Sequence, residues 1–260
     1  MSPKLSVIIP TKNRSRYLAQ AIKSIIKQTF KNWELIIIDD HSQEDIKKVT
    51  NSFKDKRIKY FRLKKGTGIA AARNFGNLKA KSPIIVVADS DDLNYPSRLK
   101  ITYNHFQKNS KTDFFYGNMD IYSEKKDKKT KRWFQPYNQE LLYQINYIPH
   151  PASAYKKEIF QKVNGYDESL KVSADYNLWL TFADANVNFG YTKKTLSILR
   201  LHQGNISKEY ALRLKSHIEK IRQKHKIKKQ DISLALVKKL AVPSVYKAFS
   251  TPFQKKLWFN

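Results

Sequence analysis

An acidic run directly follows an apolar segment that is typical of a buried strand. The apolar segment is 83–88, and the run that leaves it is Asp89-Ser90-Asp91-Asp92. Carboxylates this close together repel one another, so the run by itself stabilises a fold poorly. A hard divalent cation with a phosphate beyond it would make the arrangement favourable, because such cations prefer oxygen ligands. The run therefore indicates an enzyme that handles a nucleotide-activated substrate.

The segments before this run alternate between predicted strands and helices. Short apolar segments predict four strands, at 5–9, 33–38, 58–63 and 83–88. Apolar periodicity and turn residues predict three helices between them, at 17–26, 42–53 and 69–79. Ser42 and Asp45 resemble a capping box at the start of the second helix. This order predicts a parallel sheet with helices on both faces, in which ligands bind beyond the carboxyl ends of the strands.

Acidic residues end two of these predicted strands. Asp39 and Asp40 end the second strand, as Asp89, Asp91 and Asp92 follow the fourth. All five carboxylates are therefore expected at one edge of the sheet, which favours a shared site over five separate solvated acids.

The second half of the chain is less regular. Its predicted helices and strands are helices at 96–109, 157–163 and 174–185 and strands at 113–122 and 153–155. Three side chains of the last helix are expected to face inward: Leu178, Trp179 and Phe182. Residues 124–132 are charged and predict a solvated hairpin tip, and residues 165–168 predict a turn.

The composition favours anionic partners. The 260 residues carry a formal net charge of +28, which suits nucleic acid, an acidic membrane surface or phosphate-bearing substrates. Lysine supplies most of this charge, so an A/T-rich genome explains it as well as a selected basic surface does. There is no cysteine, which excludes disulfides and thiolate metal sites. The sequence contains neither a signal peptide nor an apolar run of about 20 residues, so we expect a soluble or peripheral cytoplasmic protein.

Taken in order, the motifs of the chain resemble those of the family 2 glycosyltransferases, which have the GT-A fold. The resemblance covers roughly residues 4–205 and is specific as an ordered set. The matching motifs are Ser6-Val7-Ile8-Ile9-Pro10-Thr11-Lys12-Asn13, Gln28-Thr29-Phe30, Ile38-Asp39-Asp40-His41-Ser42, Ala72-Arg73-Asn74, Asp89-Ser90-Asp91-Asp92, Gly165-Tyr166-Asp167-Glu168 and Ala174-Asp175-Tyr176.

The resemblance implies an α/β fold with a Rossmann-like, mostly parallel central sheet flanked by helices and a C-terminal helical appendage. It implies a catalytic domain at 1–205, with a nucleotide-sugar-binding half at 1–95 and an acceptor-binding half at 96–205. Residues 206–260 would form a basic helical extension.

On the donor side, the resemblance places Pro10, Thr11 and Asn13 in a loop that lines the nucleotide pocket. Asp40 would accept a hydrogen bond from an N–H of the base, with Asp39 as a neighbouring structural acid. The alternative for Asp40 is an acid that only stabilises the start of a helix.

Basic residues near this loop leave two points open. Lys12 stands where some relatives place an aromatic residue that stacks on the base, so the identity of the base is open. Arg73 would support the donor phosphates, or would pair with Asp89 or its neighbours instead. Lys64 and Lys65 are further phosphate candidates in a chain rich in lysine.

The acidic run corresponds to the family's metal motif, so the resemblance implies Mn2+ or Mg2+, which would neutralise the departing diphosphate. Asp89 and Asp91 are also expected to contact the nucleotide-sugar. Either Asp91 or Asp92 would bind the cation directly, and the other would hold the ribose hydroxyls. His202 resembles a histidine that closes the active site of many relatives, as a metal ligand, a diphosphate contact or a structural side chain.

On the acceptor side, Asp175 matches the acid that serves the family as general base. It would take the proton of the acceptor hydroxyl as that oxygen attacks the anomeric carbon opposite the nucleotide, which inverts the configuration. An acid that only stabilises a helix start is the alternative. Asp167, Glu168 and His150 would contact the acceptor, although the first two suit a turn equally well.

The expected function is therefore an inverting, metal-dependent transfer of a sugar from a nucleotide-diphosphate sugar, and the favoured donor is a UDP-sugar. The acceptor would be a glycan or lipid-linked glycan in cell-surface polysaccharide synthesis. A sugar nucleotidyltransferase is the alternative enzyme, but such enzymes usually carry a glycine-rich loop where this chain has residues 10–13. Specific nucleic-acid binding is not expected, because the sequence contains neither zinc-ligand spacing nor an aromatic RNA-binding motif.

The extension at 205–260 raises the prospect of a further partner. It holds 14 Lys or Arg residues against 3 acids. Apolar and aromatic residues lie among them: Val242, Val245, Tyr246, Phe249, Phe253, Leu257, Trp258 and Phe259. This mixture suits peripheral contact with an anionic membrane surface, here the inner face of the plasma membrane. The alternative is an appendage that packs on the catalytic domain, with Pro243 and Pro252 as breakers between its helices.

Overall fold

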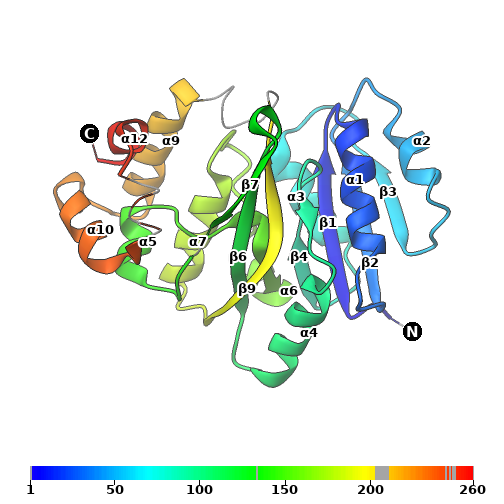
Figure 1. The fold of residues 1–260 in the computed structure, drawn as a ribbon, viewed down its shortest axis with the longest axis horizontal. Coiled ribbons are helices and arrows are strands. Elements are labelled where there is room, and N and C mark those ends of the chain that lie inside the picture. The colour runs from blue at the N-terminus through cyan, green and yellow to red at the C-terminus, as the bar shows by residue number, and fades with distance from the viewer. Residues whose placement is uncertain are drawn as a thin grey trace.

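The centre of the molecule is a mixed sheet of nine strands (Figure 1). The computed structural model describes residues 2–132, 134–202, 211–243, 245, 247 and 250–259. The strand order is β3-β2-β1-β4-β8-β6-β9-β5, with β7 paired to β6. The strands are β1 Leu5–Thr11, β2 Trp33–Asp39, β3 Ile58–Arg62, β4 Ile84–Val87, β5 Leu93–Asn94, β6 Phe114–Ser123, β7 Lys128–Arg132, β8 Ser153–Lys156 and β9 Phe189–Leu201. Strands β5, β7 and β8 run against the other six, so the sheet is mostly parallel, as the sequence predicts.

Helices cover both faces of the sheet and form two hydrophobic cores. Alternate residues of β1 serve the two cores, because Val7 and Ile9 pack with α1, α2 and α4, whereas Ile8 packs with α3 and α7. The helices are α1 Ser15–Ile26, α2 Ile46–Asn51, α3 Ile69–Lys79, α4 Arg98–Lys108, α5 Gln139–Gln144, α6 Lys157–Lys162, α7 Ala174–Asp184, α9 Ala211–Lys224, α10 Leu234–Leu240 and α12 Pro252–Trp258. Every residue of β1 and β2 is buried, which is why these strands read as unbroken apolar segments.

Two predictions about local structure were wrong. Residues 124–132 are not only a hairpin tip, because a short 3-10 turn, Glu124–Lys126, leads into β7, which pairs with β6. The second helix begins at Ile46 rather than near residue 42, and Asp45 alone caps it by accepting a hydrogen bond from the Lys48 backbone N–H at 2.9 Å. The Ser42 hydroxyl instead accepts a hydrogen bond from the Asn13 backbone N–H at 3.0 Å, so no capping box forms.

The helices α9, α10 and α12 pack against the same core as α7, at the end of the molecule opposite β1, β2 and β3 (Figure 1). Val245, Leu257 and Trp258 of this extension are buried, and the Trp258 ring meets the Tyr176 ring edge-on at 5.3 Å. Val242 is 38% exposed, whereas Phe259 is half-buried. Tyr246, Phe249 and the side chain of Phe253 lie outside the described residues, as do residues 203–210, where the expected extension begins. This packing matches the appendage alternative for most of the described apolar residues.

Replacing Trp258 with Ala is expected to lower the free energy of unfolding by about 3–5 kcal/mol, because it leaves a cavity beside Tyr176 in the main core. Urea denaturation followed by circular dichroism measures the loss. Val242→Ala is the matched control, since Val242 belongs to the same extension but is exposed, and its effect should stay within about 0.5 kcal/mol. Equal effects of the two substitutions would show that α12 does not contribute to the core.

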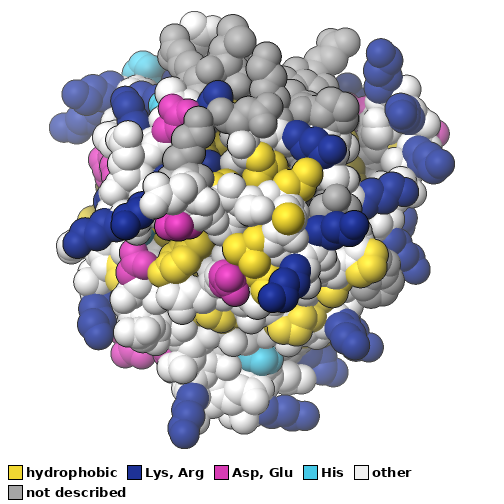
Figure 2. Space-filling model, turned by 90° about the vertical axis from the view of Figure 1, so that its left-hand side faces the viewer, with side chains coloured by type: hydrophobic (Ala, Val, Ile, Leu, Met, Phe, Trp, Pro, Cys, Tyr) yellow, Lys and Arg dark blue, Asp and Glu magenta, His cyan; other side chains and the backbone are white. Residues whose placement is uncertain are grey.

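The face built by the C-terminal helices carries mixed charge. Lys and Arg side chains are spread around this face, with Asp and Glu side chains and apolar patches between them (Figure 2). Among the described residues, no helix is both long and apolar enough to cross a membrane.

Candidate active site

The carboxyl ends of β1, β2 and β4 lie at one edge of the sheet, because these three strands are neighbours and parallel. Thr11 at the end of β1 is aligned with Asp39 at the end of β2, and Ile8 is aligned with Val87 at the end of β4. The loops that follow these strands therefore bring both acidic motifs to the same edge, as the sequence predicts.

Asp39 is a structural acid. Its side chain is fully buried and accepts hydrogen bonds from the Ser42 backbone N–H at 2.8 Å, the Tyr60 hydroxyl at 2.8 Å and the Arg62 guanidinium at 3.0 Å. Burial, with this acceptor beside it, raises the pKa of Tyr60 to about 12. Asp39 thus ties β2 to β3.

Asp40 holds the start of α3. One carboxylate oxygen accepts from the Thr67 backbone N–H at 2.6 Å, and the other accepts from the Gly68 backbone N–H at 3.1 Å. Gly68 has φ +96°, a conformation that side-chain-bearing residues rarely adopt, so the sequence needs glycine there. Lys12 Nζ lies 3.8 Å from the same carboxylate. These contacts match the helix-start alternative, and the contact with a nucleotide base stays a prediction.

Asp89 lies between two basic side chains. The Arg73 guanidinium donates a hydrogen bond to one carboxylate oxygen, and His150 Nδ1 lies 3.7 Å from the other. Burial would raise the pKa of Asp89, but Arg73 and His150 outweigh it and hold the pKa well below its usual range. The second His150 nitrogen, Nε2, lies 3.0 Å from the Tyr166 hydroxyl. Arg73 therefore pairs with Asp89, which is one of the two roles that the sequence left open for it, and His150 lies beside the acidic run.

Asp91 and His202 are distant in sequence but lie side by side in the structure. His202 Nε2 lies 3.0 Å from Asp91 Oδ2, although 111 residues separate them in sequence. Arg14, between β1 and α1, donates a hydrogen bond from Nη1 to the same Asp91 oxygen, and this nitrogen lies 3.2 Å from His202 Nε2. The imidazole of His202 also stacks on Tyr17, with 4.4 Å between ring centroids.

Asp92 lies deeper than Asp91. Its side chain is buried, and Oδ1 accepts a hydrogen bond from the Arg200 backbone N–H at 2.9 Å. The other oxygen, Oδ2, is buried without a hydrogen-bond partner among the described residues. Burial, followed by the charges of Asp89 and Asp91, raises the pKa of Asp92 well above its usual value. A carboxylate in this position gains from any cation placed at the acidic run.

Arg98 in α4 is a site residue that sequence reasoning missed. Its guanidinium is buried and donates to the backbone carbonyl oxygens of Val87 at 2.6 Å and Ser153 at 3.2 Å. Burial lowers the pKa of Arg98 to about 10, while the charges of Asp89 and Asp92 oppose this shift. Arg98 therefore stays charged at neutral pH, and its charge interacts favourably with those of Asp89 and Asp92. The one signal in the sequence was an arginine at the start of a helix that follows the run.

Substituting Asp92 and Asp89 should change stability in opposite directions, measured by thermal melting at pH 7.5 with EDTA present. Asp92 has a raised pKa in the folded state, so it costs stability as pH rises above 3.8 and through that folded pKa. Asp92→Asn should therefore raise Tm, by about 2–4 °C for each kcal/mol recovered. Asp89 has a lowered pKa and contributes stability above 3.8. Asp89→Asn should cost about 3–5 kcal/mol, because Arg73 is left buried and unpaired.

The difference between the two melting temperatures should shrink as pH falls through 3.8, where the unfolded carboxylates take up protons. Lower Tm values for both variants at pH 7.5 would contradict the charge assignment of Asp92.

Asp175 is the second residue of α7 and is half-buried. Its Oδ2 accepts a hydrogen bond from the Asn146 amide at 3.0 Å. The pKa of Arg73 is raised, because Asp89, nearby tyrosines and Asp175 together outweigh the lowering effect of burial. The charge of Asp175 therefore acts on the guanidinium that pairs with the acidic run, so the predicted base and the donor-side residues belong to one region. Asn146 was not identified from the sequence.

Asp167 and Glu168 bind other parts of their own chain. Asp167 accepts hydrogen bonds from the Ser169 backbone N–H at 3.1 Å and from Lys224 Nζ of α9 at 2.9 Å. Glu168 accepts from the Asn74 amide at 2.8 Å. These contacts match the turn alternative, and contact of either acid with an acceptor stays a prediction.

Several polar atoms in this region are buried without a hydrogen-bond partner among the described residues, among them Thr11 Oγ1, Arg73 Nη1, Asp92 Oδ2, Arg98 Nε and Asn146 Oδ1. Such atoms are rare in folded proteins and require an explanation, for which a bound ligand or water is the usual one. Asn13, by contrast, uses its side chain to accept a hydrogen bond from the Gln43 backbone N–H at 2.7 Å. Pro10 is buried in β1.

The donor set suits a cation that arrives with phosphate. In the described ranges, no three His, Cys, Asp or Glu side chains converge on one point. Magnesium and similar ions commonly take one or two protein carboxylates and complete their shell with water and substrate phosphates. The convergence of Asp91 Oδ2 and His202 Nε2, with the unpartnered Asp92 Oδ2 in the same run, fits this pattern.

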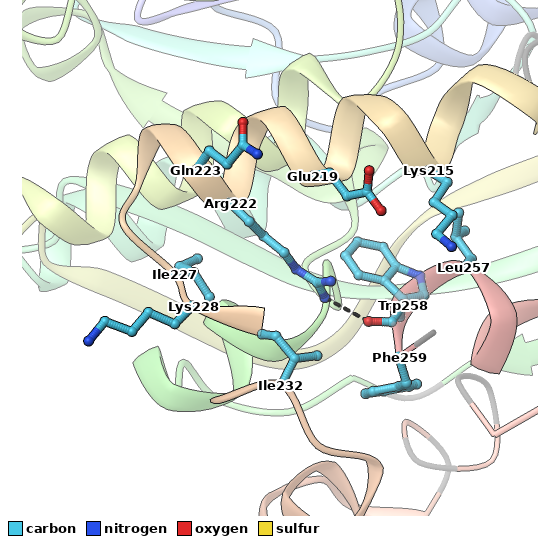
Figure 3. A pocket seen from close by; sticks show the side chains of 10 residues that line it. All are labelled: Lys215, Glu219, Arg222, Gln223, Ile227, Lys228, Ile232, Leu257, Trp258 and Phe259. Atoms are coloured by element: carbon cyan, nitrogen blue, oxygen red, sulfur yellow. Dashed lines mark hydrogen bonds between the residues drawn. The ribbon is translucent and has the colours of Figure 1, made fainter. Parts of the chain in front are cut away.

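A separate cavity of about 360 Å³ lies between α9 and α12 (Figure 3). Arg222 and Trp258 line it, and the Arg222 guanidinium donates to the Trp258 backbone carbonyl at 2.9 Å. None of the predicted catalytic, donor or metal residues lines this cavity. It is therefore a feature of the C-terminal packing, and the chemistry is assigned to the acidic edge of the sheet.

Comparison with known sequences gives one family. The family model described as glycosyl transferase family 2 matches residues 6–163. An uncharacterized glycosyltransferase of Rickettsia conorii is 35% identical over 210 residues, which are 77% of this chain and 33% of that protein. The chain thus spans about a third of the length of this relative and of similar glycosyltransferases from Rickettsia felis and Rickettsia bellii.

Two further relatives come from Escherichia coli. The putative colanic acid biosynthesis glycosyl transferase WcaA is 28% identical over 79% of this chain and 75% of its own length. WfgD, a UDP-Glc:alpha-D-GlcNAc-diphosphoundecaprenol beta-1,3-glucosyltransferase, is 34% identical over 45% of this chain and 46% of its own length.

Solved structures share the fold. Staphylococcus aureus TarS 1-349 in complex with UDP-GlcNAc has a TM-score of 0.69 at 17% identity, covering 98% of this chain and 78% of that one. The mannosyltransferase PcManGT from Pyrobaculum calidifontis, in complex with GDP-Man and Mn2+, has a TM-score of 0.67 at 12% identity, covering 100% and 84%. Identities this low support the fold alone, and the fold is the one predicted from the sequence.

Proposed function

The chain belongs to glycosyltransferase family 2, and we propose that it transfers a sugar from a nucleotide-diphosphate sugar to a hydroxyl group with inversion. The observation that carries this proposal is the meeting of Asp91 and His202, whose Oδ2 and Nε2 atoms are 3.0 Å apart. Residues 1–95 would bind the donor and residues 96–205 the acceptor. A UDP-sugar is the donor that we favour, because WfgD uses UDP-Glc and TarS binds UDP-GlcNAc.

On the donor side, Arg73 and Thr11 would meet the nucleotide-sugar. Arg73 Nη1 and Thr11 Oγ1 are buried without a partner in the part of the chain that the structure describes, and a phosphate or ribose oxygen would satisfy them. Asp89 keeps Arg73 charged and oriented, since it accepts a hydrogen bond from the other guanidinium nitrogen. Asp40 would hold the loop at Thr67 and Gly68 in place beside the donor, and it would also contact the nucleotide base.

Asp91 and His202 would hold the divalent cation, and Mn2+ is favoured because PcManGT binds it together with GDP-Man. When bound, the cation would supply positive charge to the diphosphate as the glycosidic bond breaks. We assign the direct contact to Asp91 rather than Asp92, since Asp92 is more deeply buried and already accepts the Arg200 backbone N–H. Asp92 would strengthen the site as a second negative charge behind Asp91.

Asp175 would act as the general base. The acceptor oxygen attacks the anomeric carbon, its proton passes to the Asp175 carboxylate, and the electron pair of the broken C–O bond leaves with the nucleoside diphosphate. The Asn146 amide, which donates to Asp175 Oδ2, would orient the carboxylate and leave Oδ1 to take the proton. His150 would contact the sugar that is being transferred, because it lies between Asp89 and Tyr166.

The acceptor that we favour is a growing surface glycan on a lipid diphosphate. WfgD acts on a diphosphoundecaprenol-linked sugar, and WcaA is assigned to colanic acid biosynthesis, which supports this class of substrate. Peripheral contact with a membrane would then bring the enzyme to its acceptor, through exposed Lys and Arg side chains rather than through the buried Trp258.

A screen of nucleotide-sugar hydrolysis with Mn2+ present tests this function. We expect release of a nucleoside diphosphate from one donor, loss of that release with EDTA, and restoration by added Mn2+. Release of pyrophosphate from a nucleoside triphosphate and a sugar 1-phosphate would identify a nucleotidyltransferase instead. Turnover of neither substrate class would refute both enzyme assignments.

A further inference from the structure

We propose that Arg14 occupies the cation position between Asp91 and His202 when no cation is bound, and that the cation displaces it. A single guanidinium nitrogen of Arg14, Nη1, contacts both Asp91 Oδ2 and His202 Nε2. These two atoms are themselves 3.0 Å apart. Arg14 thus contacts the same two atoms that would bind the cation, and the inference rests on the function proposed above.

In the His202 tautomer whose Nε2 carries no proton, the chemistry of the three groups requires a positive group between them. A guanidinium has only donors, so His202 Nε2 accepts from Arg14 when its lone pair points at Nη1. The lone pairs of Nε2 and of the Asp91 carboxylate then point toward one place and repel each other unless a positive group bridges them. Arg14 supplies that group from within the chain, and a divalent cation held by Asp91 and His202 would supply more positive charge.

Electrostatic repulsion allows only one of the two positive groups, the guanidinium or the divalent cation, to occupy the site. The side chains of Arg14, Asp91 and His202 are 15%, 16% and 5% exposed, so water screens the charges only weakly. A guanidinium and a divalent ion on the same carboxylate oxygen would repel each other strongly in such surroundings. Cation binding therefore requires the guanidinium to withdraw from Asp91.

Arg14 is placed to make this movement. It is the residue directly before α1, and the Leu18 backbone N–H donates to its carbonyl oxygen at 2.8 Å, so the backbone is anchored. The long side chain can rotate while this anchor stays in place. The neighbouring loop residues Lys12 and Asn13 are exposed, which leaves space toward solvent on that side.

Calorimetric titration of Mn2+ into the full chain, without nucleotide, tests the exchange. Arg14→Met should bind Mn2+ about 10- to 100-fold more tightly than the wild type, the factor that corresponds to one charge-assisted hydrogen bond. Arg16→Met is the matched control, because it removes an equal charge two residues away from an exposed position, and its affinity should stay within about twofold of the wild type. Thermal melting confirms that each variant is folded.

Unchanged or weaker binding by Arg14→Met would overturn the exchange, as would an equal gain in Arg16→Met, which would reflect bulk charge alone. The absence of binding by all three proteins would overturn it as well. The hydrolysis screen separates this result from the proposed function. A wild type that hydrolyses a donor while Arg14→Met gains no affinity refutes the exchange only, and tighter binding by Arg14→Met without hydrolysis by the wild type refutes the function only.

Discussion

Asp175→Asn is expected to lower turnover by about 10³-fold while leaving the affinity for the nucleoside diphosphate nearly unchanged. An amide cannot accept the proton of the acceptor hydroxyl, and loss of a general base typically costs about 10²- to 10⁴-fold. Asn keeps the shape of the side chain and can still accept from Asn146, so the start of α7 should not move. Single-turnover kinetics with a saturating acceptor, paired with calorimetry for the nucleotide, measures both quantities.

Asp184→Asn is the matched control for this substitution. Asp184 lies at the other end of α7 and is 43% exposed, where it contacts His225. The control should keep wild-type turnover because the same chemical change is made far along the same helix. If Asp175→Asn also keeps normal turnover, Asp175 only stabilises the start of the helix, as an acid in the first turn can.

Asp91→Ala is expected to weaken nucleoside diphosphate binding in the presence of Mn2+ by about 100-fold or more, and to change it little when EDTA is present. Loss of a direct ligand should cost more than loss of a supporting residue around a metal, which costs about 10- to 100-fold. Asp92→Ala should fall in that lower range, because Asp92 acts through its charge and its bond to Arg200. Calorimetry with Mn2+ and with EDTA measures the affinity of the wild type and of each variant for the nucleoside diphosphate.

Asp127→Ala controls for the loss of one acidic charge, since Asp127 is exposed in the turn between β6 and β7. Its nucleotide affinity should match that of the wild type. A larger loss for Asp92→Ala than for Asp91→Ala would reverse the assignment of the direct ligand. Equal losses with and without Mn2+ would show that these acids do not act through a cation.

The parallel half of the fold could be predicted because its strands are buried on both faces and read as continuous apolar segments. Strand β9 could not be predicted, although His202 directly follows its last residue. It carries exposed lysines at 193 and 194 in its middle, and its register with β6 shifts beside Gly117, so neither alternation nor an apolar run marks it. Helix α5 was also not predicted.

The residues of the site could be predicted from the sequence better than the contacts between them. The order of motifs brought Asp91 and His202 into one hypothesis, and the structure places them together. Arg14, which donates to Asp91, and Arg98, whose charge interacts with Asp89 and Asp92, come from elements on either side of the run, and only the topology makes them neighbours. Arg14 directly follows the loop at 10–13, which was the available signal in the sequence.

The contact between Trp258 and Tyr176 joins α12 to the helix of the proposed base. Tyr176 directly follows Asp175, so whatever loosens α12 also loosens the residue beside the base. We therefore expect the amide hydrogens of α7 and α12 to exchange with solvent together, at the rate of global opening. An engineer who trims the last helix to obtain a smaller enzyme would remove part of the scaffold that holds the base.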